Sequence, residues 1–367
     1  MSDPRVAKLA KVLVHYSVEV QKGQQVIIRT SPIAEELTLA VYEEIIRAGA
    51  HPFITNEVPG AKEAFYKLAS DDQLDYISPI DQLIVETFDA YIHLWADYNT
   101  RELSGIDPGR VARSRRTQAA ISQKFLQRAA EGKLRWALTV YPNYAMAQEA
   151  DMSLRDYTEF VYGAGMLDDE DPVAFWRGEG ARQQKLIGWL QGHDRTVLKG
   201  SNVDISLSIK ERPFIECSGR ENFPDGEIFT SPVEESVNGW IRFKYPAIFS
   251  GQEIHDIELW FEDGKVVKEK ASKNQELLTS ALDTDAGSRF LGEWGIGTNY
   301  GIQRFTKNML FDEKIGGTIH FAVGAGYPES GSRNESGLHW DMLCEMSDAE
   351  IIIDDELFYK DGHMVIG

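Results

Sequence analysis

The sequence predicts an α/β protein with an N-terminal open α/β domain followed by a β-rich domain. Short apolar runs alternate with helical patterns through the first half, and a two-residue alternation of apolar and polar residues replaces them in the second half. The chain has 367 residues, which exceeds the ~250–300 residues over which a single core usually grows. We therefore expect two domains, residues 1–195 and residues 196–367.

The first half begins with a helix and continues as strands separated by helices. Asp3 is suited to cap a helix that has Pro4 in its first position. Short apolar runs flanked by helical segments are typical of buried parallel strands in an open α/β layer structure. The expected strands are residues 26–28, 52–55, 90–96 and 136–141, and the expected helices after the first are residues 35–48, 117–130 and 172–191.

The second half has the two-residue period of half-buried strands. Apolar residues alternate with polar ones over residues 203–209 and 241–245. Residues 258–267 carry two strand patterns around Asp263-Gly264, a dipeptide that favours the tight turn of a β-hairpin. We therefore expect the C-terminal domain to consist mainly of strands.

The charge of the chain disfavours several classes of partner. There are 38 Lys and Arg residues against 58 Asp and Glu residues, a formal net charge of −20. Binding to nucleic acid or to an anionic membrane needs clustered basic side chains, so we expect neither partner. The two cysteines, Cys217 and Cys344, do not make a disulfide framework. No apolar run approaches the ~18 residues of a membrane span, and the N-terminal helix is amphipathic, so we expect a cytoplasmic protein.

A His-x-Asp step in the second half is the first sign of a metal site. His339 and Asp341 lie two residues apart, so on a strand their side chains share one face and can converge on one cation. His320 lies in an apolar segment typical of a buried strand. Each signal alone has a plainer explanation, because polar pairs are common on surface strands and a buried histidine is more often a hydrogen-bonded core residue.

Three glutamates and a tyrosine strengthen the case for a metal site. Glu227 follows a Pro-Asp-Gly turn at the expected start of a strand, and sites form at such rims. Glu293 lies among glycine and apolar residues, where a carboxylate is costly unless it is paired or bound to metal. Glu313 has the features of a polar turn, which the neighbouring Lys314 supports, and Tyr327 lies in a glycine-rich loop that can bend back over a site. Together these residues supply nitrogen and oxygen ligands and more carboxylates than one ion needs, which suits two divalent ions bridged by a carboxylate.

At these residues the chain resembles the thermophilic-type metallo-aminopeptidases, the aminopeptidase T and aminopeptidase S family. The resemblance spans nearly the whole chain, because the family also combines an N-terminal α/β half with a C-terminal β-rich, metal-binding catalytic half. One departure lies between Glu313 and His320, where this chain is about two residues longer than the bacterial type members and contains Gly316-Gly317. The segments that carry the resemblance are residues 222–230 (NFPDGEIFT), 291–293 (LGE), 311–313 (FDE), 320–327 (HFAVGAGY) and 339–341 (HWD).

The resemblance implies a metal-dependent aminopeptidase that removes the N-terminal residue of a peptide through a water shared by two metal ions. It implies two divalent ions per chain, Zn, Co, Mn or Mg, within about 3.5–4 Å of each other, and a homodimer whose substrates are peptides with a free N-terminus. We expect Glu293 to bridge the ions, Glu227 to accept the water proton or to act as a ligand only, and Tyr327 to donate a hydrogen bond to the tetrahedral oxyanion. The implied metal ligands are Glu227, Glu293, Glu313, His320, His339 and Asp341, and the implied catalytic residues are Glu227, Glu293 and Tyr327.

Two alternatives stay open from the sequence. A related branch of this fold contains mononuclear Fe(II) ring-cleaving dioxygenases, which here would use His320, His339 and Asp341 and leave the three glutamates without a role. A non-catalytic metal-binding homologue would keep the same fold. The presence of all three glutamates and of Tyr327 argues against both alternatives.

Overall fold

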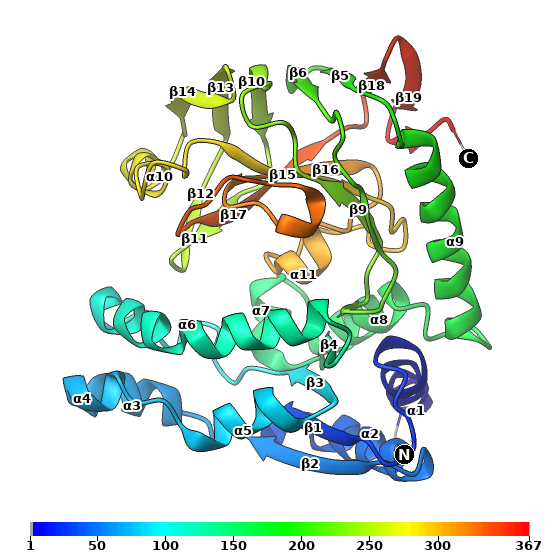
Figure 1. Cartoon of the computed structure of the whole chain (residues 1–367), viewed down its shortest axis with the longest axis vertical. Coiled ribbons are helices and arrows are strands. Elements are labelled where there is room, and N and C mark those ends of the chain that lie inside the picture. The colour runs from blue at the N-terminus through cyan, green and yellow to red at the C-terminus, as the bar shows by residue number, and fades with distance from the viewer. Residues whose placement is uncertain (1–2, 367) are drawn as a thin grey trace. The chain divides into compact units, whose positions relative to one another are not determined.

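The computed structural model describes residues 3–366, which divide into two compact units. Unit 1 comprises Met1–Val173 and Gly219–Pro224, and unit 2 comprises Ala174–Ser218 and Asp225–Gly367. Figure 1 labels the helices and strands of each unit. A parallel sheet in unit 1 and a β-rich unit 2 confirm the predicted fold class. The sequence predicts a boundary at residue 195; in this division residues 174–195 belong to unit 2, and residues 219–224 add a strand to unit 1 through backbone pairing that no local sequence pattern signals.

Unit 1 is built on a sheet of five parallel strands, β1 (Gln25–Thr30), β2 (His51–Asn56), β3 (Ala90–Trp95), β4 (Arg135–Val140) and β8 (Asn222–Phe223). Their order in the sheet is β2-β1-β3-β4-β8. Val26, Ile27 and Ile28 of β1 are fully buried, as the apolar run predicts. The four strands expected in the first half are therefore confirmed, and the pairing of Asn222 with Leu138 adds a fifth from later in the chain.

The helices of unit 1 include the predicted ones of residues 1–130 and several that sequence periodicity did not indicate. Asp3 caps the first helix by accepting a hydrogen bond from the backbone N–H of Arg5, as expected. The shortest of them has four residues, too few to display a full period, and begins at a local cap, where the Ser70 hydroxyl accepts from the N–H of Gln73. The helices are α1 (Pro4–Val12), α2 (Glu35–Arg47), α3 (Ala61–Leu68), α4 (Asp71–Leu74), α5 (Pro79–Thr87), α6 (Pro108–Ala130), α7 (Tyr144–Glu149) and α8 (Leu154–Ala164), with a π-helical turn at Leu13–Ser17 and a 3-10 turn at Pro32–Ala34.

Unit 2 contains antiparallel sheets of eight, five and two strands. In sheet order, the eight-stranded sheet contains β14 (Lys265–Lys270), β13 (Ile257–Glu262), β10 (Asn238–Phe243), β6 (Val203–Ser208), β5 (Arg195–Lys199), β18 (Glu350–Ile353), β19 (Glu356–Lys360) and β20 (His363–Met364). The five-stranded sheet contains β17 (His339–Glu345), β16 (Thr318–Gly324), β15 (Leu291–Gly297), β9 (Glu227–Thr230) and β7 (Ile215–Cys217). The remaining elements are β11 (Ala247–Phe249), β12 (Gln252–Ile254), α9 (Pro172–Leu190), α10 (Gln275–Leu282), α11 (Met309–Asp312) and a 3-10 turn at Pro328–Ser330.

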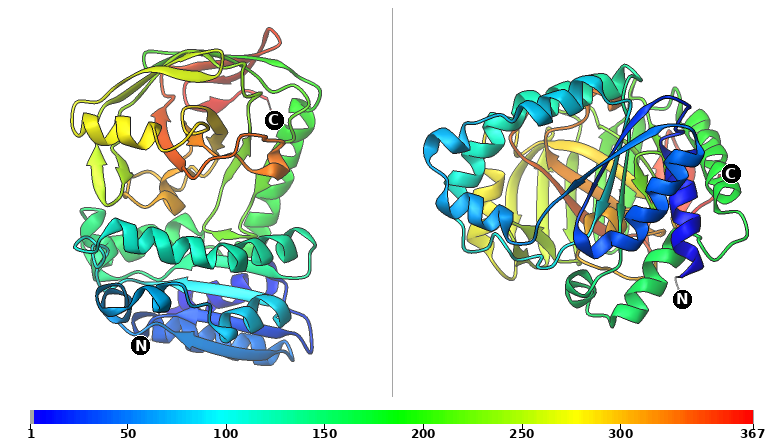
Figure 2. Two further views of the ribbon diagram at one scale, coloured as in Figure 1. Left: turned by 60° about the vertical axis from the view of Figure 1, so that its left-hand side comes forward. Right: turned by 90° about the horizontal axis from the view of Figure 1, so that it is seen from below.

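The two large sheets of unit 2 form separate layers that share one hydrophobic core (Figure 2). Ile205, Ile241 and Leu259 reach this core from the eight-stranded sheet, and Trp294 and Phe321 reach it from the five-stranded sheet. All five side chains are at most 1% exposed. Inward-facing apolar residues alternate with outward-facing ones along each strand, as in other pairs of packed sheets.

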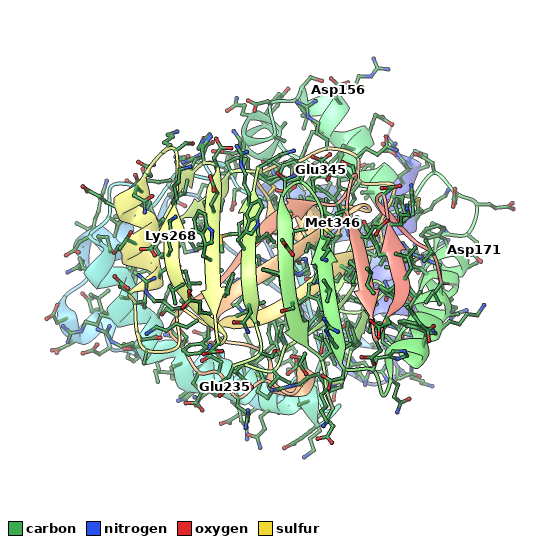
Figure 3. The ribbon with its side chains drawn as sticks, turned by 90° about the horizontal axis from the view of Figure 1, so that it is seen from above. Asp156, Asp171, Glu235, Lys268, Glu345 and Met346 are labelled. Carbon is green, nitrogen blue, oxygen red and sulfur yellow. The ribbon has the colours of Figure 1, made fainter. Side chains whose placement is uncertain are left out.

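The predicted hairpin is present as β13 and β14. Asp263 and Gly264 form its turn with φ values of 47° and 82°. Glycine is required at the second position, because a Cβ there would lie 1.7 Å from the carbonyl oxygen of Glu234. Figure 3 looks onto the eight-stranded sheet and labels Lys268 on β14, whose ammonium lies 4.1 Å from the ring centroid of Trp260.

Two sequence observations concern the chain as a whole. Neither Cys217 nor Cys344 forms a disulfide in the structure. Among the helices within residues 3–366, none combines the length and the apolar character that crossing a membrane requires.

We expect the substitution Phe321→Ala to destabilise unit 2 strongly. The Phe321 side chain is fully buried between the two sheets, so its removal leaves a cavity that the surrounding strands fill poorly. The free energy of unfolding should fall by about 3–5 kcal/mol. Val267→Ala is the control, because Val267 is 49% exposed on β14 and should change stability little. Urea unfolding followed by circular dichroism gives the comparison, and a loss below about 1 kcal/mol for Phe321→Ala would contradict this account of the core.

Candidate metal centre

The five-stranded sheet has one face in the core and one face that carries the predicted ligands. Trp294, Phe321 and Trp340 point into the core from β15, β16 and β17. Residues one position away point to the opposite face, because successive side chains on a strand alternate. That face carries Glu227 at the first residue of β9, Glu293 on β15, His320 on β16, and His339 and Asp341 on β17.

The strand register brings these residues together and places small residues between them. Glu293 lies opposite Ala322, and Ala322 lies opposite Asp341, so two carboxylates flank one methyl group. Glu227 lies opposite Gly297. Small side chains at the intervening positions leave space above the sheet, where the longer polar side chains converge.

Gly295 makes room for the imidazole of His320, which lies opposite it across β15 and β16. A Cβ at position 295 would lie 2.0 Å from Cε1 and 2.1 Å from Nε2 of His320. Real Cβ atoms do not approach other atoms so closely, so any other residue at position 295 would displace the ring. The glycine is therefore part of the site, although it offers no ligand atom.

Glu293 lies between the two histidines and directs one carboxylate oxygen to each. Its Oε1 lies 3.1 Å from Nε2 of His320, and its Oε2 lies 3.8 Å from Nε2 of His339. The Glu293 side chain is 6% exposed. This position is the one that a carboxylate bridging two ions would occupy, which supports the role expected from the sequence.

His339 is held with one ring nitrogen directed to the carboxylates. Its Nδ1 lies 2.7 Å from the carbonyl oxygen of Ala325, to which it donates as an N–H. Its Nε2 lies 3.5 Å from Oδ2 of Asp341, so on metal binding this nitrogen presents its lone pair to the same point as the carboxylate. A backbone acceptor that fixes the ring in this way is typical of histidine ligands to metals.

Three groups of side chains have potential ligand atoms that lie within 4.8 Å of one another. The first group is Glu293, His339 and Asp341, the second group is Glu227, Glu293 and His320, and the third group is Cys217, Asp225 and Glu227. Glu293 belongs to both the first and the second group. The first and second groups therefore contain, between them, all five expected ligands on this face of the sheet.

Several buried atoms in these groups have no hydrogen-bond partner among the described residues. They include Oε2 of Glu227, Oε2 of Glu293, Oδ1 of Asp341 and Nδ1 of His320. A buried carboxylate oxygen without a donor is costly, and a cation would satisfy it. Oxygen and imidazole donors are those that Zn, Co and Mn prefer, so the residues fit the divalent ions that the sequence predicts.

Burial and mutual charge shift the pKa values of these groups. Burial raises the pKa of Glu227 to about 8, although the charge of Lys314 opposes the shift. Burial also raises the pKa of Glu293. Burial disfavours the cation of His320, but the charges of Glu227 and Glu293 outweigh it and raise its pKa to about 9. In the metal-free chain, protons therefore balance the buried carboxylates, and ion binding would release them.

Tyr327 lies at the rim of the site, beside His339. The two ring centroids are 5.2 Å apart, and Phe229 packs against the tyrosine at 5.6 Å. Burial, reinforced by the charge of Glu293, raises the pKa of Tyr327, so its hydroxyl stays protonated and able to donate a hydrogen bond. The ring is 42% exposed, so a substrate can reach it.

Glu313 and Lys314 lie differently from the exposed polar turn that the sequence suggests. Lys314 is 0% exposed, and its Nζ lies 2.5 Å from Oε1 of Glu313 and contacts Oε1 of Glu227. Glu313 is linked to Glu227 through this ammonium but belongs to none of the three groups. The interpretation of Lys314 as evidence for a solvated turn is wrong, because the turn after α11 buries the side chain among carboxylates.

Two further residues lie at this end of the sheet that were not predicted from the sequence as part of the site. Asp225, predicted as part of a turn, is 1% exposed, and its Oδ1 lies 3.6 Å from Nζ of Lys314. Cys217 lies opposite Glu227 in the pairing of β7 with β9. Lys314 follows Asp312 and Glu313 directly, so its local sequence is that of a polar turn and carries no signal of its burial.

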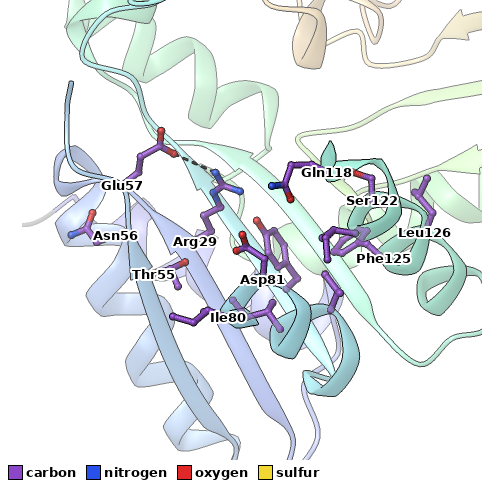
Figure 4. A pocket seen from close by; sticks show the side chains of 14 residues that line it. Arg29, Thr55, Asn56, Glu57, Ile80, Asp81, Gln118, Ser122, Phe125 and Leu126 are labelled. Atoms are coloured by element: carbon purple, nitrogen blue, oxygen red, sulfur yellow. Dashed lines mark hydrogen bonds and ion pairs between the residues drawn. The ribbon is translucent and has the colours of Figure 1, made fainter. Parts of the chain in front are cut away.

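A separate cavity of about 750 Å³ lies within unit 1 (Figure 4). Arg29 and Glu57 face each other at its edge, with Nη2 3.4 Å from Oε2. Phe125 and Leu126 of α6 contribute apolar lining. None of the predicted site residues lines this cavity, so it is distinct from the candidate metal centre.

We expect the substitution Gly295→Ala to weaken metal binding without unfolding the chain. The added methyl group overlaps the His320 ring and forces it out of the second group. Affinity for a divalent ion should fall about 10–100-fold. Gly188→Ala is the matched control, because Gly188 lies in α9 with open space around its Cβ. Equilibrium dialysis against Mn²⁺ measures both variants, and unchanged affinity in Gly295→Ala would contradict the role given to this glycine.

Comparisons with known proteins agree with this geometry. A family model described as thermophilic metalloprotease, M29, matches residues 2–363. Aminopeptidase T of Thermus thermophilus is 27% identical, over 97% of this chain and 95% of its own length. Aminopeptidase 2 of Geobacillus stearothermophilus is 24% identical over 94% of this chain and 92% of its length, and aminopeptidase AmpS of Bacillus subtilis is 23% identical over 93% and 92%.

A solved structure shares the fold. Wild-type AmpT from Thermus thermophilus superposes with a TM-score of 0.87 over 99% of both chains, at 22% sequence identity. The family model covers nearly every residue, including both units and all the predicted ligands. The chain therefore belongs to the M29 family of thermophilic metalloproteases.

Proposed function

We propose that the protein is a metal-dependent aminopeptidase that removes the N-terminal residue from peptides. The observation that carries the proposal is Glu293, whose two carboxylate oxygens are directed to His320 and His339 on one face of a sheet. Membership of the M29 family makes the chain a metallopeptidase, and the relatives that match it are named aminopeptidases.

Two ion positions fit the ligand groups. In this proposal the first group would hold one divalent ion and the second group another, and Glu293, which belongs to both groups, would be a ligand to each. Glu313 completes the second position when its carboxylate turns away from Lys314. Ions bound there would polarise the scissile carbonyl, acidify the attacking water and ligate the free α-amine of the peptide. Zn, Co, Mn and Mg all suit these nitrogen and oxygen donors in different degrees.

Glu227 and Tyr327 have the positions required for proton transfer and for charge stabilisation. Glu227 is a buried carboxylate of the second group, so in its ionised form it can accept the proton of the attacking water. Tyr327 stays protonated at the rim and donates a hydrogen bond to the oxyanion that forms at the carbonyl. In this proposal His320, His339 and Asp341 serve as metal ligands.

The dioxygenase alternative is not supported. It requires the three glutamates to have no role. Oε1 of Glu293, however, lies 3.1 Å from Nε2 of His320, and Glu293 belongs to both the first and the second ligand group. The comparisons identify a metalloprotease family and do not support a ring-cleaving enzyme or a non-catalytic homologue.

The partners and the location belong to the same proposal. The names of the relatives support peptides with a free N-terminus as substrates. The net charge of −20 favours cationic amino termini over anionic substrates. The homodimer rests on the sequence resemblance, and the cytoplasmic location stays an expectation from the sequence.

We expect Glu293→Gln to lower activity and metal affinity together. An amide keeps the shape of the side chain but removes the negative charge that both ions share. Turnover and affinity should each fall at least about 100-fold, while the melting temperature of the metal-free protein changes little. Glu262→Gln, at the exposed end of β13, is the control. Elemental analysis and peptide hydrolysis on the same samples decide it, since near-normal turnover at full metal content would rule out the bridging role.

We expect hydrolysis to require a free α-amine. A neutral amine has a lone pair for a metal ion, whereas the nitrogen of an N-acetylated terminus has its lone pair delocalised into the amide. Short peptides should therefore lose one residue at a time, and their N-acetylated forms should resist. Mass spectrometry of both reactions at equal concentration measures this. Equal cleavage of the two forms, or first products longer than one residue, would identify an endopeptidase or amidase instead.

A further inference from the structure

Lys314 places a positive charge inside the candidate metal centre. Its side chain is 0% exposed, and its Nζ contacts Oε1 of Glu227 and lies 2.5 Å from Oε1 of Glu313. Oδ1 of Asp225 lies 3.6 Å away on the same ammonium. A lysine is rarely buried so completely unless carboxylates surround it, so this cation belongs to the acidic cluster itself.

The backbone of Lys314 is fixed beside β15. Its N–H donates to the carbonyl of Phe311 at 3.1 Å, and its carbonyl accepts from the N–H of Asn299 at 3.0 Å. A Cβ on Gly297 would lie 3.0 Å from the carbonyl carbon of Lys314, which shows how closely the turn approaches the strand. The side chain therefore moves only through its own rotatable bonds, among the carboxylates within its reach.

The carboxylates that Lys314 holds are those that the second ion needs. Glu227 belongs to the second group, and Glu313, a ligand implied by the family resemblance, shares the ammonium of Lys314 with it. No hydrogen bond or ion pair described in residues 3–366 joins Lys314 to the first group, Glu293, His339 and Asp341. The cation thus affects the two ion positions unequally.

We propose that Lys314 is a tethered cation that competes with the second metal ion for Glu227 and Glu313, so that the first group fills before the second. This inference rests on the proposed two-ion function. In the metal-free chain the ammonium is paired with both glutamates. A second ion enters when the ammonium releases these two carboxylates and stays beside Asp225. Asp225 belongs to the third group and not to the first. The second ion is therefore the exchangeable one.

Binding of Mn²⁺ alone tests this inference without reference to activity. Titration calorimetry of metal-free protein, with bound ions counted by equilibrium dialysis, gives the number of steps and the affinity of each. For the wild type we expect two steps, with the second weaker by about tenfold or more, because a charge-assisted contact must break. For Lys314→Met the second affinity should rise by about the same factor, and the first should stay within about threefold.

Two further variants keep the experiment interpretable. Lys199→Met, on an exposed position of β5, controls for the loss of one positive charge. Lys314→Met leaves buried carboxylates without a cation, so its metal-free form can unfold. The double variant Asp225→Asn/Lys314→Met removes one negative and one positive charge and should fold, while it keeps Glu227 and Glu313 for the ion. Its second affinity should also exceed that of the wild type.

Each outcome separates the inference from the proposed function. Two steps of equal affinity in the wild type, or no gain of second-ion affinity in the Lys314 variants, would overturn the competition but leave a two-ion enzyme. A single ion in every variant would overturn both the competition and the two-ion site. If only the wild type is limited to one ion and the variants bind two, the competition is supported. A fall in second-ion affinity in the variants would make Lys314 a support of the site instead of a competitor.

Discussion

Buried negative charge is the constraint on which the candidate metal centre depends. Asp225, Glu227 and Glu293 are at most 5% exposed, and Asp341 and Glu313 lie beside them. Carboxylates so placed are stable only with compensating positive charge or with protons. The chain supplies two imidazoles and the ammonium of Lys314, and oxygens without a donor remain. Metal binding is therefore a consequence of the same charge balance that stabilises unit 2, which is why ion binding and stability are coupled there.

The geometry of the ligands is set by the opposite face of the sheet. Trp294 and Phe321 pack into the core between the two large sheets and hold β15 and β16 in register. A slip of one residue would move Glu293 and His320 into that core, so the apolar packing specifies the position of every ligand. Gly295 and Ala322 then provide the space that the ligands need. The core packing, the strand register and the small residues together hold the two ligand groups in place before any ion binds.

The turn after α11 sets the position of Lys314. It includes Gly317, whose φ of 93° favours glycine. A Cβ on Gly316 would lie 2.5 Å from the ring of Tyr300. These glycines let the turn close tightly against β15 with Lys314 directed to Glu227.

The sequence alone predicted the fold class and several strands of both halves, because alternation and glycine placement are local properties of the chain, and the family resemblance implied the six candidate ligands. It also indicated the bridging position of Glu293 from its apolar, glycine-rich surroundings. Only the tertiary structure decided that Lys314 is buried among carboxylates and that residues 219–224 complete the sheet of unit 1. Both depend on contacts between segments far apart in sequence. A charged residue in a turn has the same local pattern whether it faces water or a buried carboxylate, so its partners appear only once the strands are paired.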